Sequence, residues 1–257
     1  RYAFRQASVV VAVSEAIRQQ LLDLGVPVAK LRRITNGVDP EEFRPGTVRR
    51  ADYGLPDDVP LAFFAGDLRS PRKNLDTVLA ALRRAPGVHL AVAGDATQSP
   101  YPALAEELGV ADRVHFLGFR SDMPDLMRAA DFFVFPSRYE PFALVVVEAM
   151  ASGLPVVTAR NVGAARLVDD AAGVVLDDPN DAPALARAMQ RLAGDAERRA
   201  RMGAAARRIA RRYDVRSMAE AYVNLLEAVA AGRHRGADRE LESAEDREET
   251  HRVGEAP

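Results

Sequence analysis

Short apolar runs alternate with amphipathic segments along most of the chain. The apolar runs predict strands at residues 8–13, 31–35, 61–65, 88–93, 113–117, 131–135, 155–158 and 173–176. The remaining segments predict helices at residues 14–24, 75–83, 102–108, 122–129 and 144–151, with three more between residues 181 and 231. Near-continuous apolar strands are typical of a parallel sheet whose two faces are covered by helices. The pattern therefore predicts an α/β fold with a doubly wound, Rossmann-like parallel sheet.

The alternation is interrupted at two places along the chain. Residues 41–59 are rich in Pro, Gly and charge, which predicts a linker between a strand–helix–strand unit at residues 1–40 and an α/β domain at residues 60–213. A further helix is expected at residues 214–231. Residues 232–257 carry eight acidic and five basic side chains and few apolar ones, so we predict a disordered tail there.

The composition excludes several classes of site. The 257 residues carry 35 basic and 37 acidic side chains, and this balance gives no support to nucleic acid as a partner. The absence of cysteine excludes disulfides, thiolate nucleophiles and cysteine-bound zinc. There is no Asp-x-Asp motif or Walker A loop, and no apolar run has the length of a membrane span. Lys30 and Lys73 are the two lysines, so either is a candidate for a specific role.

The first candidate site, at residues 136–150, lies where a predicted strand ends and a predicted helix begins. The carboxyl edge of a parallel sheet next to a helix N-terminus is where such folds bind phosphate-bearing ligands. Glu140 precedes the helix, whereas Glu148 lies inside it among valines, where a carboxylate is costly unless it meets a hydroxyl group or a cation. Spacing alone leaves open the alternative that Glu140 merely starts the helix and Glu148 lies on a polar stripe.

The second candidate site is the strand, glycine turn and helix start at residues 65–74. It contains three cations, Arg69, Arg72 and Lys73, which could neutralise the charge of a departing diphosphate. The alternative that the residues leave open is a solvated, arginine-containing loop.

Several motifs stand in a family-specific order. Glu140 and Glu148 are separated by seven residues within PSRYEPFALVVVEAMASGLPVV, and VVVAVSEAI, ITNGVD and RVHFLGF precede them. Over residues 9–230 the chain resembles glycosyltransferase family 4, whose members are retaining enzymes with the two-domain GT-B architecture. The resemblance implies the C-terminal, donor-binding half of such an enzyme. Residues 1–40 would then be the end of the N-terminal acceptor domain, and the helix at residues 214–231 would cross back to it, both with apolar faces exposed.

The resemblance also implies roles in catalysis. Glu140 would face the hydroxyl groups of the donor sugar and support the charge that develops at the anomeric centre. Lys73, with Arg69, would stabilise the departing diphosphate, and Arg72 would bind the donor phosphates. Asp67 stands where family members usually have Arg, so we hypothesise that Arg69 or Arg72 substitutes for that cation.

Further roles concern the rest of the donor. Glu148 would accept hydrogen bonds from the ribose hydroxyl groups. Phosphate and sugar would be bound by the backbone amides of Phe142, Ala143 and Leu144, and the base by the loop containing Phe119 and Arg120. Three further positions depart from the family pattern, namely Pro141 and Ala143 in place of glycines and Arg166 in place of an acidic residue.

The function implied by the resemblance is retaining transfer from a UDP-, GDP- or ADP-sugar to a hydroxyl group of a glycan, lipid or small molecule. It requires no metal and no other cofactor, and it implies a bacterial protein of the cytoplasm or the inner membrane face, with peripheral membrane contact left open. We expect little transfer from this chain alone. A non-catalytic sugar-nucleotide-binding module, favoured by Asp67, is the first alternative. An RNA- or membrane-surface protein acting through the Arg-rich residues 197–212 is the second.

Overall fold

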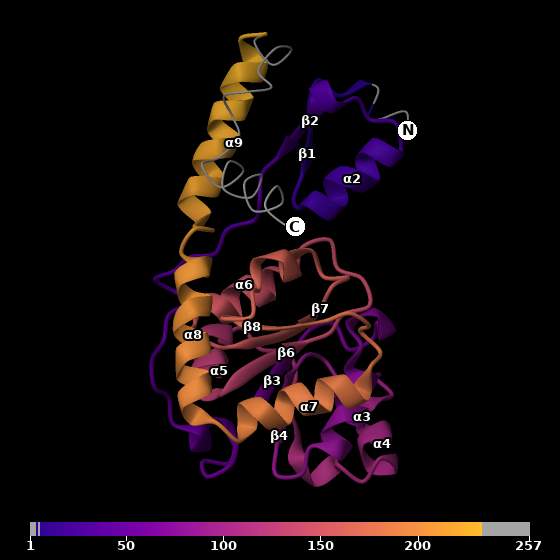
Figure 1. Ribbon diagram of the computed structural model, residues 1–257, viewed down its shortest axis with the longest axis vertical. Coiled ribbons are helices and arrows are strands. Elements are labelled where there is room, and N and C mark those ends of the chain that lie inside the picture. Colours follow the sequence, from indigo (N-terminus) through magenta and orange to yellow (C-terminus); the bar gives the residue numbers. More distant parts are fainter. Residues whose placement is uncertain (1–3, 5, 233–257) are drawn as a thin grey trace, which may run out of the picture. The chain divides into compact units, whose positions relative to one another are not determined.

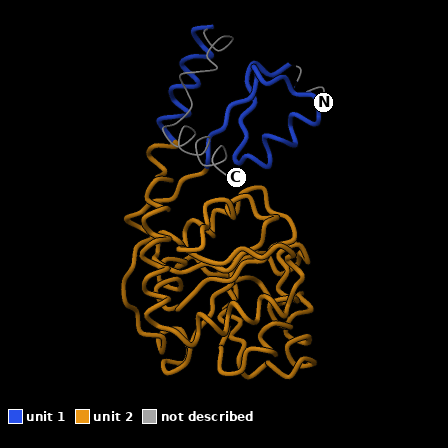
Figure 2. Tube along the Cα trace, viewed as in Figure 1, with its two compact units in different colours: residues 1–35, 219–257 blue, residues 36–218 orange. Residues whose placement is uncertain are grey.

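The computed structural model describes residues 4 and 6–232, which form two compact units (Figures 1 and 2). Unit 1 contains the described residues up to 35 and from 219 onward, and unit 2 contains residues 36–218. Val38 belongs to unit 2 and is bound there through its backbone. Its N–H donates to the Tyr213 carbonyl (2.8 Å), and its carbonyl accepts from the Val215 N–H (3.0 Å). The predicted disordered tail lies outside the described residues, apart from Gly232.

Unit 1 contains a two-stranded parallel sheet of β1 (Val10–Ala12) and β2 (Leu31–Arg33), joined by α2 (Glu15–Asp23). The hydroxyl of Ser14 accepts from a backbone N–H of the first turn of α2, as its position before the helix predicted. The buried core of this small sheet consists of Ala12, Leu21, Val26 and Leu31. These elements thus form a strand–helix–strand unit. Helix α9 (Val215–Ala230) begins in unit 2 and continues into unit 1.

Unit 2 is built on a six-stranded parallel sheet with the strand order β5-β4-β3-β6-β7-β8. The strands are β3 (Leu61–Ala65), β4 (His89–Ala93), β5 (Val114–Phe116), β6 (Phe132–Phe135), β7 (Val156–Ala159) and β8 (Gly173–Leu176). This order matches the Rossmann type and confirms the predicted fold class. The order reverses between β3 and β6, and in folds of this type the loops that follow two such strands border the ligand-binding crevice at the carboxyl edge of the sheet.

Helices cover both faces of this sheet. They are α3 (Leu75–Arg84), α4 (Tyr101–Glu107), α5 (Met123–Ala129), α6 (Leu144–Ala151), α7 (Ala182–Ala193) and α8 (Ala196–Ala210). Helices α3 and α7 pack together on one face, and α6 and α8 pack together on the other (Figure 1). The predicted helices and strands end within two residues of the observed bounds.

The centre of the sheet is filled by phenylalanine rings from β3 and β6. The rings of Phe63 and Phe133 lie 5.9 Å apart, those of Phe64 and Phe135 lie 5.8 Å apart, and all four side chains are buried. Tilted ring pairs of this kind add to the hydrophobic gain from burying the rings. The two strands that border the crevice are thus packed firmly against each other.

Residues 41–59, predicted as a linker, are bound to the amino edge of the sheet in unit 2. The guanidinium of Arg50 donates to the Ala129 carbonyl (2.7 Å) and pairs with Asp131 (2.9 Å), whose carboxylate also accepts from the Leu61 N–H (2.8 Å). Among residues 4 and 6–232, no helix is long and apolar enough to cross a membrane.

Candidate functional site

The two predicted sites meet at the carboxyl ends of β3 and β6. The Lys73 ammonium forms an ion pair with the Glu140 carboxylate, and each side chain is only 15% exposed. The ammonium also lies 5.3 Å from the centre of the Phe135 ring, within the range of a cation–π contact. The structure therefore brings the predicted cation and the predicted carboxylate into direct contact at the point where ligands bind in such sheets.

Lys73 is presented by a short 3-10 turn (Pro71–Lys73) after β3. The Ser70 hydroxyl accepts from the Arg72 N–H (3.4 Å) at the start of the turn. Gly66 leaves room for the lysine stem, because a Cβ atom there would lie 3.3 Å from Lys73 Cγ. The local sequence thus turns the lysine back over the end of its own strand.

Asn74 is a component of the site that sequence reasoning missed. It ends the turn in the left-handed region (φ 67°), and its side chain is fully buried. Its amide nitrogen donates to the carbonyls of Pro136 (2.8 Å) and Pro179 (2.7 Å), and its amide oxygen accepts from the Thr77 hydroxyl (2.6 Å). The available signal was an asparagine directly after Lys73 at a helix start, because asparagine tolerates left-handed backbone better than most residues.

The loop that carries Glu140 is held by backbone pairing with the segment after β7. The Glu140 N–H donates to the Asn161 carbonyl (3.3 Å), and its carbonyl accepts from the Gly163 N–H (2.9 Å). Only glycine fits at position 163, because a Cβ atom there would lie 2.1 Å from the Pro141 carbonyl oxygen. This pairing fixes the backbone from which the Glu140 side chain reaches Lys73.

Helix α6 begins beside this loop with an open N-terminus. Its N-cap is Ala143, whose side chain offers no acceptor to the first backbone N–H groups, of which the Val146 N–H donates to the Ala143 carbonyl (3.0 Å). The first N–H groups of a helix generally lack partners inside it and attract anions, aided by the helix dipole. Phe142 and Ala143 are buried, whereas Leu144 is 38% exposed. The three predicted amides therefore lie at the start of α6, although the helix itself begins at Leu144.

Ala143 adopts a left-handed backbone (φ 72°) that favours glycine. The Cβ atom makes this conformation cost roughly 1–2 kcal/mol. We expect Ala143→Gly to raise the free energy of unfolding by about 1 kcal/mol, measured by urea denaturation. Ala149→Gly is the control: it lies inside the same helix at ordinary helical dihedrals and should lower stability by about 1 kcal/mol. Equal losses from both substitutions would contradict a strained Ala143.

Glu148 lies one turn after Leu144 on the same face of α6. Burial raises the pKa of its carboxyl group to about 7, and the nearby Glu42 carboxylate contributes in the same direction. Among residues 4 and 6–232, no hydrogen bond or ion pair to this carboxylate is found. A hydroxyl group of a ligand could donate a hydrogen bond to such a half-buried carboxyl group and so satisfy it.

Arg69 and Arg72, one of which is hypothesised to replace the cation missing at Asp67, follow β3 and make other contacts. The Arg69 guanidinium is exposed and pairs with Asp67 (2.9 Å), and this hydrogen bond lowers the pKa of the Asp67 carboxyl. Arg72 is also exposed, and its carbonyl accepts from the Arg138 N–H (2.9 Å) and the Ser137 hydroxyl (2.9 Å). In this structure the Arg69 guanidinium therefore binds Asp67. The main chain of Arg72 connects the loop after β3 to the loop after β6.

The predicted base-binding loop follows β5 at the same edge of the sheet. Phe119 is 85% exposed. The Arg120 side chain pairs with Asp122 (2.8 Å), and its guanidinium lies 5.5 Å from the centre of the Tyr53 ring. The Phe119 side chain is thus open to solvent, while the loop is joined to the one after β4 by the Gly94 N–H, which donates to the Gly118 carbonyl (2.8 Å).

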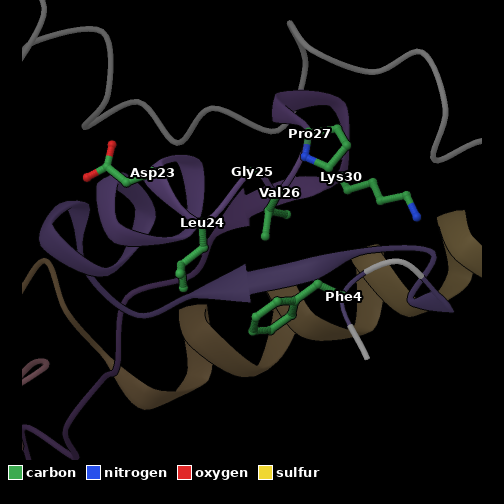
Figure 3. Close-up of a pocket in the computed structure, with 7 residues that line it drawn as sticks. All are labelled: Phe4, Asp23, Leu24, Gly25, Val26, Pro27 and Lys30. Carbon is green, nitrogen blue, oxygen red and sulfur yellow. The ribbon is translucent and has the colours of Figure 1, made fainter. Parts of the chain in front are cut away.

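A separate hollow of about 500 Å³ lies within unit 1 (Figure 3). It is lined by Phe4, Asp23, Leu24, Gly25, Val26, Pro27 and Lys30. Its two charged side chains, Asp23 and Lys30, lie at opposite ends (Figure 3), and the Lys30 ammonium donates to the Ala7 carbonyl (2.8 Å). The two charges therefore lie apart, unlike the ion-paired charges of Lys73 and Glu140.

The fold and the crevice place the chain among GT-B glycosyltransferases. Sucrose-phosphate synthase from Thermosynechococcus elongatus superposes with a TM-score of 0.82 at 29% identity, covering 90% of this chain and 60% of that structure. The Anabaena protein HepE, solved in complex with UDP-glucose, superposes with a TM-score of 0.79 at 30% identity, covering 88% of this chain and 65% of that structure.

Residues 47–209 match the family model of the group 1 glycosyl transferases, and residues 1–42 match that of glycosyltransferase family 4. The chain belongs to the group 1 glycosyl transferases. The lipopolysaccharide core biosynthesis glycosyltransferase LpsE of Rhizobium meliloti is 31% identical over 87% of this chain and 65% of its own length. The D-inositol 3-phosphate glycosyltransferase of Saccharomonospora viridis is 37% identical over 79% of this chain and 51% of its own length. The chain thus spans about half to two thirds of these relatives.

Proposed function

We propose that unit 2 binds the nucleotide-diphosphate sugar of a retaining glycosyltransferase and supplies the donor half of its catalytic centre. The observation that carries this proposal is the meeting of Lys73 and Glu140 where the strand order reverses. A diphosphate needs a cation and backbone donors, and a donor sugar needs a hydrogen-bond acceptor for its hydroxyl groups. Lys73, the α6 N-terminus and Glu140 supply these groups in one crevice.

The donor phosphates would lie between Lys73 and the first N–H groups of α6. The Lys73 ammonium is paired with the Glu140 carboxylate, so donor binding would exchange one anionic partner for another. The freed Glu140 carboxylate can then accept from the sugar hydroxyl groups. The partnerless Glu148 carboxyl is placed to accept from the ribose hydroxyl groups, and the loop at Phe119 is placed to contact the base.

The proposed reaction is a displacement on one face of the sugar. The bond between the anomeric carbon and the diphosphate oxygen breaks, and the acceptor hydroxyl oxygen bonds to that carbon from the same face. The acceptor proton passes to the departing phosphate oxygen, so no general base is required of unit 2. Lys73 and the α6 dipole stabilise the developing negative charge, the role that fixed donors have in such sites. We propose that these groups suffice without a metal ion.

The proposal is tested by calorimetric titration of the chain with UDP, GDP and ADP and with the three monophosphates. One diphosphate should bind at a single site, and its monophosphate should bind about tenfold more weakly because it lacks the phosphate that reaches Lys73 and α6. Lack of binding by all three diphosphates would contradict the proposed function. The retaining outcome is checked by NMR of the product's anomeric configuration, with the full-length gene product and an added acceptor.

A sugar-nucleotide-binding module without turnover is the second candidate. It is favoured by Asp67, which stands in place of the family's usual arginine and holds the Arg69 guanidinium. Assays of donor hydrolysis and sugar transfer by the full-length gene product distinguish the two. Saturable nucleotide binding without turnover would favour the module.

A further inference from the structure

The buried side chain of Asn74 connects three loops at the carboxyl edge of the sheet, namely its own loop after β3 and the loops after β6 and β8. Both amide hydrogens and the amide oxygen are used, toward Pro136 in the loop after β6, Pro179 in the loop after β8 and Thr77 in α3. Pro136 lies four residues before Glu140, and Asn74 directly follows Lys73. The amide therefore connects the two loops that carry the ion-paired residues.

Other contacts join the same loops closer to solvent. The Arg138 N–H donates to the Arg72 carbonyl (2.9 Å), and the Arg138 guanidinium pairs with Asp76 (2.6 Å). The Arg138 side chain is 34% exposed, whereas Asn74 is fully buried. Exposed ion pairs contribute little to stability, while buried hydrogen bonds are strong and costly to break. The Ser137 hydroxyl also donates to the Arg72 carbonyl (2.9 Å) nearer to solvent, so the Asn74 amide makes the most deeply buried hydrogen bond between the two loops.

The geometry of the site depends on this connection. Without the amide, the Pro136 and Pro179 carbonyls would lose their buried donors, and the loops could move apart to reach water. Lys73 and Glu140 would then no longer be held at the separation that serves phosphate and sugar together. Displacements of about 1 Å in such sites are enough to impair ligand binding and catalysis.

We propose that Asn74 is a positioning residue of the donor site, which holds the Lys73 loop in register with the Glu140 loop through its three side-chain hydrogen bonds. The inference rests on the proposed function, because it assigns Lys73 to the donor diphosphate. Asn74 itself is buried and touches no ligand; it acts through Lys73.

A double-mutant cycle tests this role. Asn74→Gly keeps the left-handed backbone accessible and removes the side chain with its amide. Binding of UDP, GDP and ADP is measured by calorimetry for wild type, Asn74→Gly, Lys73→Met and the double variant. We expect Asn74→Gly to weaken the best-binding diphosphate about fivefold to tenfold in the wild-type background, and to have no further effect once Lys73 is methionine. Equal weakening in both backgrounds would overturn the inference.

Two more variants keep the test decisive. Thr77→Val removes the hydroxyl group that orients the amide, so it should weaken nucleotide binding about threefold, again only when Lys73 is present. It replaces Asn74→Gly in the cycle if Asn74→Gly does not fold. Asp131→Asn perturbs the hydrogen bonds at the opposite, amino edge of the sheet and should leave nucleotide affinity unchanged. Wild-type affinity in folded Asn74→Gly would overturn the inference but leave the proposed function intact. Failure of wild type to bind any diphosphate would refute the proposed function itself.

Discussion

Replacing Lys73 with methionine is expected to weaken nucleoside diphosphate binding about thirtyfold. A charge-assisted hydrogen bond to phosphate contributes about 2 kcal/mol, which corresponds to this factor. Methionine keeps most of the apolar stem that crosses Gly66 and Phe135, so the loss reports the ammonium group. Calorimetric titration of the variant and of wild type with UDP, GDP and ADP measures it.

The same substitution should lower the free energy of unfolding by about 3 kcal/mol at neutral pH, because Glu140 is then left half-enclosed without its cation. Urea denaturation measures this loss, and Glu140→Gln in the Lys73→Met background should recover most of it. Lys30→Met is the control, since Lys30 is the other lysine and lies in unit 1. A Lys73→Met protein that binds diphosphate as well as wild type would contradict the phosphate-binding role of Lys73.

Replacing Glu148 with glutamine is expected to change stability and affinity in opposite directions. Because the pKa of Glu148 is raised to about 7 in the folded protein, the folded state holds its proton more tightly than the unfolded chain does. Stability therefore falls as pH rises from the ordinary carboxyl pKa to about 7, and the penalty is complete above pH 7. Glutamine removes this penalty, so the variant should be about 3 kcal/mol more stable than wild type at pH 8 and equally stable at pH 4.

The affinity of Glu148→Gln for a nucleoside diphosphate should fall about tenfold at pH 8, because a carboxylate accepts from two ribose hydroxyl groups more strongly than an amide does. Urea denaturation across pH and calorimetry at pH 8 measure the two effects. Glu107→Gln, at an exposed position at the end of α4, should change neither. A stability gain without loss of affinity would place the ribose away from Glu148.

Much of the fold could be predicted because its strands are buried on both faces and read as continuous apolar runs. The strands Leu61–Ala65 and Gly173–Leu176 have the predicted bounds. The neighbours within the sheet could not be read from periodicity. β6 follows β5 in the chain, yet it pairs with β3, and this pairing brings Lys73 to Glu140.

How much of the candidate site can be predicted from sequence depends on how local each interaction is. Lys73 and Glu140 could be predicted from motif positions. Asn74 could not, because its amide is bound to main-chain carbonyls 62 and 105 residues away, and a carbonyl carries no sequence signature. The hypothesis that Arg69 or Arg72 replaces the cation missing at Asp67 stays a prediction, and Asp67 itself binds the Arg69 guanidinium two residues away.

The location of the donor is tested most directly by amide hydrogen exchange with and without a saturating nucleoside diphosphate, chosen from UDP, GDP and ADP by the titration. Bound phosphate should slow exchange most at residues 142–146, where the α6 N–H groups meet it, and in the loops at residues 66–74 and 118–120. Protection confined to residues 4–35, around the hollow of unit 1, or no change at residues 142–146 on saturation, would contradict a donor site in the crevice between β3 and β6.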